Sequence, residues 1–109
     1  MKPIVDRGEV SIDFPDKAYY GAFGRAAQYE ARADAEGVAF KLAQSGEDRR
    51  EAELHLHWYL FADLVTDLAE KIAAGGAPDE AHADTVRDAA RRLVEALGSR
   101  PRKSRKRPG

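Results

Sequence analysis

The chain has 109 residues, of which 43% are hydrophobic and 34% are charged, and its formal net charge is −1. This length leaves room for one compact domain, and the absence of cysteine excludes a disulfide framework, a thiolate metal site and a thiol nucleophile. Since no run of about 18 apolar residues indicates a membrane span or a signal peptide, we expect a cytoplasmic protein without membrane contact.

Alanine dominates the hydrophobic residues, with 20 positions. Because Ala has the highest helix propensity and lets helices approach closely, the composition favours an all-α fold over a β-sandwich. We predict a three-helix antiparallel bundle of two long helices and one shorter helix. A short N-terminal extended arm (1–15) precedes the helical domain (16–98), and a disordered basic tail (99–109) follows it.

The N-terminal arm shows an alternating pattern. Val10, Ile12 and Phe14 fall on one side of residues 4–14, with polar residues between them, and Pro15 ends the pattern. This alternation predicts a short strand or an extended arm.

The first long helix is predicted from about Asp16 to Ser45, where small and apolar residues recur at three- and four-residue spacing. Gly37 is its candidate kink, and Gly46 supplies a C-terminal glycine signal. A short reversal at Gly46 predicts an antiparallel helical hairpin. The recurring positions are Tyr20, Gly24, Ala27, Ala31, Ala35, Val38 and Leu42.

The second helix, about 47–74, has the strongest periodicity in the chain. Its main seam consists of Leu54, Trp58, Phe61, Val65, Leu68 and Ile72. The third helix is predicted over about 79–97, after a linker that contains Gly75, Gly76 and Pro78.

A second apolar row lies well outside the main seam of the second helix and consists of Leu56, Leu60 and Leu64. One neighbouring helix cannot cover both rows, and an exposed row would form a contiguous apolar patch of a kind that soluble monomers rarely show. We therefore predict a homodimer or a small subunit of a larger protein complex. Leu56, Leu60, Leu64 and Trp58 are the predicted interface residues.

The C-terminal tail concentrates positive charge in Arg100, Arg102, Lys103, Arg105, Lys106 and Arg107. These six cations leave the rest of the chain with a net charge of −7. Such a tail predicts salt-dependent, non-specific contact with RNA or DNA, without the aromatic residues that stack on bases. An acidic protein partner, the chain's own acidic body and the absence of a specific role remain as alternatives.

Two Glu–His pairs at i,i+4 spacing, Glu51 with His55 and Glu53 with His57, are the candidate metal ligands. Residues two positions apart on a helix diverge by about 200°, so one ion cannot use both pairs. We therefore expect neither a metal nor another cofactor.

A possible catalytic pair lies in the segment 50–55, which reads Arg-Glu-Ala-Glu-Leu-His. Its Arg-x4-His spacing resembles the motif of HEPN ribonucleases, which are all-helical domains that cleave RNA at a dimer interface. The resemblance implies His55 as general base or acid, Arg50 as the cation that stabilises the phosphorane, and metal-independent cleavage to a 2′,3′-cyclic phosphate. Glu51 departs from the Asn, Asp or His that more commonly follows this Arg in the family.

The predicted function is a non-catalytic helical interaction protein, either a dimeric adaptor or a small subunit of a larger assembly. Its basic tail contacts nucleic acid or an acidic partner. The alternative is a small, metal-independent HEPN-like ribonuclease that uses Arg50 and His55.

Overall fold

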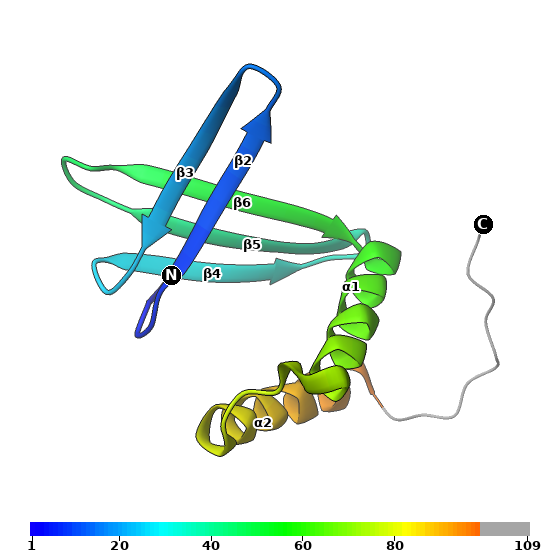
Figure 1. Cartoon of the computed structure of the whole chain (residues 1–109). Coiled ribbons are helices and arrows are strands. Elements are labelled where there is room, and N and C mark those ends of the chain that lie inside the picture. Colours follow the sequence, from blue (N-terminus) through cyan, green and yellow to red (C-terminus); the bar gives the residue numbers. More distant parts are fainter. Residues whose placement is uncertain (99–109) are drawn as a thin grey trace. The chain divides into compact units, whose positions relative to one another are not determined.

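The computed structural model describes residues 1–98, and this part of the chain is rich in β-structure (Figure 1). The strands are β1 (Lys2–Pro3), β2 (Gly8–Phe14), β3 (Lys17–Phe23), β4 (Ala27–Ala33), β5 (Gly37–Gln44) and β6 (Arg50–His57). They are followed by helix α1 (Trp58–Lys71), the wide helical turn η1 (Ile72–Gly76) and helix α2 (Glu80–Leu97). The predicted all-α three-helix bundle is therefore wrong, because strands replace the first long helix and the start of the second.

The strands form two antiparallel sheets. A four-stranded sheet has the order β1-β4-β5-β6, and β2 and β3 form a separate hairpin. The hairpin runs across β5 and β6, and its turn lies beyond β6 (Figure 1). The alternation predicted for residues 4–14 corresponds to β2, whose partner β3 was expected to be helical.

The four-stranded sheet has one apolar face and one charged face, because successive side chains along a strand point to opposite sides. The register places Val38 opposite Leu56 and Phe40 opposite Leu54 on the apolar face. On the charged face, residues of β4, β5 and β6 form the ion pairs Arg32–Glu53, Arg32–Glu30 and Lys41–Glu51.

The main core cluster is small and contains Ile4, Phe23 and Ala27. Val10 and Leu42 pack against it, so the hairpin and the four-stranded sheet meet at this point. The six buried hydrophobic residues of the described chain all lie within residues 1–61, and they are Ile4, Phe23, Ala27, Val38, Ala39 and Leu56.

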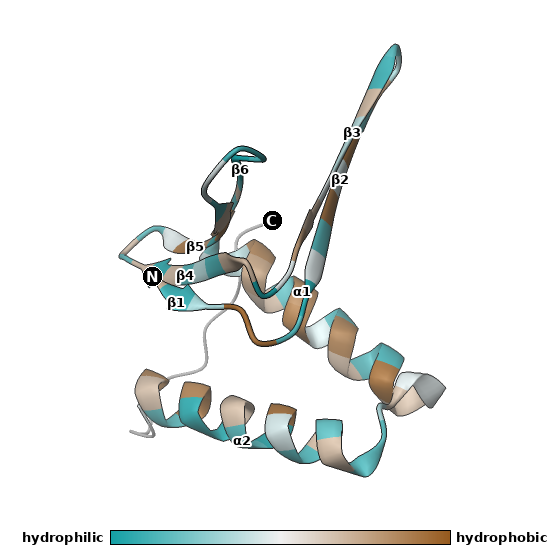
Figure 2. Ribbon diagram, turned by 90° about the vertical axis from the view of Figure 1, so that its left-hand side faces the viewer, coloured by the Kyte–Doolittle hydropathy of each residue, from teal (hydrophilic) through white to brown (hydrophobic). Residues whose placement is uncertain are grey.

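The chain divides into two compact units, residues 1–61 and the part that begins at Ala62. In the helical part, neither α1 nor α2 contains a buried residue. Brown apolar positions recur along both helices (Figure 2). Asp79 caps α2 by accepting a hydrogen bond from His82 N at 2.9 Å, and Gly75 takes a positive φ of 124° in the preceding turn.

No helix within residues 1–98 combines the length and the apolar character that crossing a bilayer requires.

The turn between β4 and β5 depends on Asp34 and Gly37. Asp34 Oδ1 accepts hydrogen bonds from Glu36 N at 2.8 Å and from Gly37 N at 3.1 Å. These two backbone donors stabilise the carboxylate and lower the pKa of Asp34 from its usual value of 3.8. The Asp34 carbonyl also accepts a 3.0 Å hydrogen bond from Trp58 Nε1, so the same turn holds the start of α1.

The lowered pKa of Asp34 predicts a pH dependence of stability. A carboxylate whose pKa is lower in the folded state stabilises the fold above its unfolded-state pKa. Its contribution is lost as the pH falls below about 3.8. We expect the melting temperature of the wild type to fall more steeply than that of Asp34→Asn between pH 5 and pH 2, because Asn keeps an acceptor that does not titrate. Circular dichroism melts of both proteins measure this difference, and parallel pH profiles would contradict the assignment.

Gly37 is required for close packing between β5 and β6. A Cβ at this position would lie 2.1 Å from the Leu56 carbonyl oxygen and 2.9 Å from His57 Cα. Both neighbours are backbone atoms, which cannot move aside without disturbing the strand pairing. We expect Gly37→Ala to lower the free energy of unfolding by about 2–3 kcal/mol in urea denaturation. Gly24→Ala is the matched control, because a Cβ there meets nothing within 4 Å.

Candidate functional site

Arg50, at the start of β6, links the hairpin to the four-stranded sheet. Its Nε donates to the Ala22 carbonyl at 2.8 Å, NH1 donates to the Asp48 carbonyl at 2.8 Å, and NH2 donates to Gln44 Oε1 at 3.0 Å. The guanidinium carbon lies 5.5 Å from the centroid of the Phe23 ring, which is only 2% exposed. One side chain therefore joins the ends of β3, β5 and β6 above the core.

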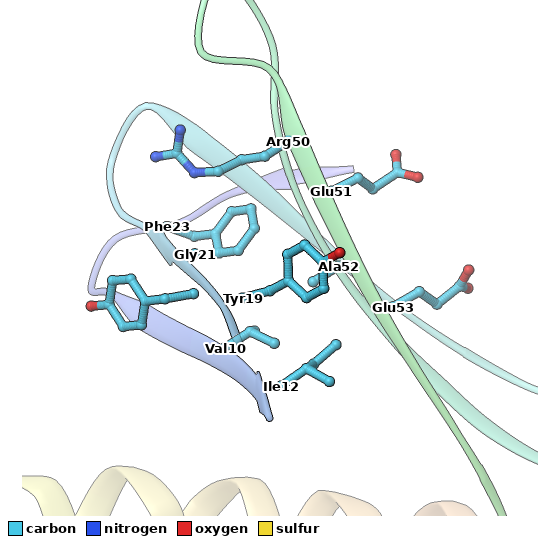
Figure 3. Close-up of a pocket in the computed structure, with 10 residues that line it drawn as sticks. Val10, Ile12, Tyr19, Gly21, Phe23, Arg50, Glu51, Ala52 and Glu53 are labelled. Carbon is cyan, nitrogen blue, oxygen red and sulfur yellow. The ribbon is translucent and has the colours of Figure 1, made fainter. Parts of the chain in front are cut away.

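Beyond this junction, the hairpin and the sheet border two adjoining hollows, the first of which is drawn in Figure 3. The first has a volume of about 420 Å³ and includes Val10, Tyr19, Phe23 and Arg50 in its lining. The second, of about 510 Å³, includes Phe40, Leu42 and Leu54. Together they form an apolar groove, which Glu51 and Glu53 border from the edge of β6.

The face of the hairpin that packs on the sheet is mainly apolar, and at its tip Lys17 Nζ lies 5.6 Å from the centroid of the Tyr19 ring. Ile12 pairs with Tyr19, and Val10 pairs with Gly21 two residues nearer the base. Phe14 and Tyr19 form an edge-on aromatic contact with ring centroids 6.1 Å apart. Ile12, Phe14 and Tyr19 are about half exposed, so this surface is only partly covered within the described chain.

Strand β6 carries an ordered series of ionisable side chains on its charged face. Figure 3 shows Glu51 and Glu53 pointing away from Arg50, and His55 and His57 follow them at the same two-residue spacing. The two imidazole rings lie 5.2 Å apart. The series therefore has two acids in its first half and two imidazoles in its second half.

Arg50 and His55, the catalytic pair of the alternative ribonuclease function, do not come together. They lie five residues apart on β6, an odd number, so their side chains point to opposite faces, roughly 16 Å apart along the strand. The resemblance to HEPN ribonucleases predicted an all-helical domain at this segment, and the strand overturns that expectation. This geometry provides no argument for cleavage of RNA by this pair.

The predicted interface residues occupy different environments. Leu56 ends the apolar face of β6 and is buried, while Trp58 is half-buried and bonded to the Asp34 carbonyl. Leu60 and Leu64 lie one turn apart on α1 and are exposed. The apolar row therefore crosses from a strand into a helix, and only its helical part remains open.

The six cations of the predicted basic tail lie outside the described residues, and their contact with nucleic acid or an acidic partner stays a prediction. Within residues 1–98, no group of three or more His, Asp or Glu side chains is placed to hold a metal ion.

Sequence reasoning placed Val10 and Ile12 on an extended arm but missed the groove, because the segments of β3, β5 and β6 that complete it were assigned to helices. A usable signal was present in β6, where Ala52, Leu54 and Leu56 alternate with charged or imidazole side chains. A second signal was the dipeptide Pro15-Asp16, which forms the turn of the hairpin.

Comparison with known proteins adds no further argument, since no family model, no curated protein and no solved structure matches this chain.

The role of Arg50 predicts a specific loss of stability. Arg50→Ala removes three hydrogen bonds and the contact with Phe23. We expect the free energy of unfolding to fall by about 2 kcal/mol in urea denaturation. Arg50→Lys should recover little of it, because an ammonium lacks the planar fork that reaches three acceptors. Arg49→Ala removes the exposed neighbouring cation and is the control, and an equal loss in both variants would contradict the linking role.

Proposed function

We propose that this protein is a non-catalytic interaction protein that associates with a second copy of itself through the helical part of the chain. The observation that carries the proposal is the apolar surface of α1 and α2. Eight large apolar side chains on these helices are between 41% and 69% exposed, namely Leu60, Leu64, Val65, Leu68, Val86, Leu93, Val94 and Leu97.

Helices of this size need a covering surface. Isolated helices of about 12–15 residues are marginally stable in water, and most helical stability comes from packing of an apolar face. α1 has 14 residues and α2 has 18, and neither contains a buried residue. Their stability therefore requires contacts beyond those seen within these helices.

The exposed area suits a second copy. A large apolar side chain that is about half exposed offers roughly 60 Å², so the eight residues offer roughly 500 Å² per copy. A standard interface buries about 800 Å² on each partner, of which roughly 57% is apolar. The two values agree, and a two-fold contact would use the same surface on both copies.

The non-catalytic part of the proposal is supported by the chemistry of β6. Arg50 directs its donors at protein acceptors, and His55 lies on the opposite face of the strand. A phosphate could not contact both groups at once.

Light scattering at tens of micromolar tests the proposal. We expect a mass of at least twice 12.0 kDa for the wild type. Leu64→Lys should shift this mass toward 12.0 kDa, because burial of an unpaired ammonium opposes association. Thr66→Lys, which adds the same charge at an exposed polar position on the opposite side of α1 from Leu64, is the control and should keep the wild-type mass. A wild-type monomer would show that the helices are covered within one chain and would overturn the proposal.

A further inference from the structure

The outer edge of β6 is open in the structure. β6 is the terminal strand of its sheet, and no strand within residues 1–98 pairs with its outer side. The Leu56 carbonyl lies against Gly37 of β5, so the backbone groups of Leu56 face inward. Because inward and outward groups alternate along an antiparallel strand, Glu51, Glu53, His55 and His57 direct their N–H and C=O groups at the open edge.

We propose that this edge pairs with the same edge of a second copy, as an antiparallel β6–β6 ladder centred on Leu54. The inference rests on the proposed self-association and adds a second contact surface, the edge of β6, to the helical surface proposed above. In this register, Glu53 of each copy lies opposite His55 of the other, and Glu51 lies opposite His57. All four ionisable positions on the charged face of each strand then face a complementary partner.

The order of the side chains makes β6 complementary to itself only when the strands run antiparallel. Two acids occupy the first half of the strand and two imidazoles the second half, so a two-fold rotation places each half beside the other. A neutral imidazole donates one N–H to a carboxylate, and an imidazolium adds opposite charge. Opposite partners across adjacent strands stabilise a sheet, whereas like charges destabilise it.

Neighbouring registers lack this complementarity. A shift of one pairing step in one direction places Glu53 opposite Glu53, and a shift in the other direction places His55 opposite His55. A shift of a single residue would exchange the two faces of the added strand. The pattern therefore specifies one alignment.

The carboxylates of Glu51 and Glu53 can accept further hydrogen bonds from a second copy. The ion pairs with Arg32 and Lys41 both use Oε2 of Glu53 and Glu51. A carboxylate accepts about four hydrogen bonds, so Oε1 can accept from an imidazole across the interface.

Two apolar features are also explained by this arrangement. Leu54 is 56% exposed in the middle of an edge strand, and the ladder would place it against its own counterpart. The hairpin projects past β6 (Figure 1), and the sheet of the second copy would continue beneath its apolar face. Ile12, Phe14 and Tyr19 would thereby gain a surface to cover.

Single-cysteine variants test the register, because the natural chain has no cysteine. At the centre of the ladder, the two Cα atoms of residue 54 would lie about 4.5 Å apart, which is within disulfide range. We expect Leu54→Cys to form a disulfide-linked dimer under mild oxidation. Ala52→Cys is the matched control and should stay unlinked, because its two copies would lie about 13 Å apart.

A charge variant tests the pairing itself. His55→Glu places two like-charged pairs across the ladder, and we expect the dissociation constant to rise roughly tenfold or more in analytical ultracentrifugation. Circular dichroism establishes that the variant is folded. Failure of Leu54→Cys to cross-link in a protein that still self-associates would overturn the β6 ladder and leave the proposed function intact. A wild-type monomer would overturn both.

Discussion

The hydrogen bonds of Arg50 are the interaction on which the arrangement of the strands depends. A two-stranded hairpin is marginally stable alone, and β2 and β3 contribute only Phe23 and part of Val10 to the core. The guanidinium attaches their base to the ends of β5 and β6 while it covers the Phe23 ring. Because the attachment is at the base, the rest of the hairpin keeps its apolar face open. The open groove and the extension of the β2–β3 hairpin beyond β6 both follow from this attachment at the base of the hairpin.

The first predicted helix shows why alanine and glycine mislead. Ala27, Ala31 and Leu42 recur at helical spacing, yet in the fold Ala31 lies across from Phe40 in an antiparallel ladder. Small residues fit both periods, so the pattern alone could not choose between them. The choice is made by the turn at Asp34 and by the close approach of Gly37 to β6, which are tertiary contacts. The strand periodicity of β2 could be predicted from the sequence, because Val10, Ile12 and Phe14 alternate with polar residues without interruption.

The predicted interface stays a prediction, but the structure changes the argument behind it. The apolar segment from Leu54 to Val65 suggested one helix with too much apolar circumference. It is instead a strand followed by a helix, with Trp58 at the junction. Leu56 is buried against β5, whereas Leu60 and Leu64 remain exposed on α1. The hydrophobic pattern predicted which residues need to pack against another surface. It could not show that some of them lie on a strand, β6, and the others on a helix, α1. Arg50 and His55 were paired through the resemblance to HEPN ribonucleases, which implied a helix, whereas the strand places them on opposite faces.

The opposite end of the four-stranded sheet limits how far such a sheet can grow. Its last strand, β1, consists only of Lys2 and Pro3. Proline offers no N–H to an incoming strand, and a two-residue template is too short to hold one in place. A sheet that can extend on one side only ends as a closed pair and does not continue as a filament. The proposed β6 ladder would therefore close as a pair, because the β1 end of the sheet resists the further pairing that fibril formation needs.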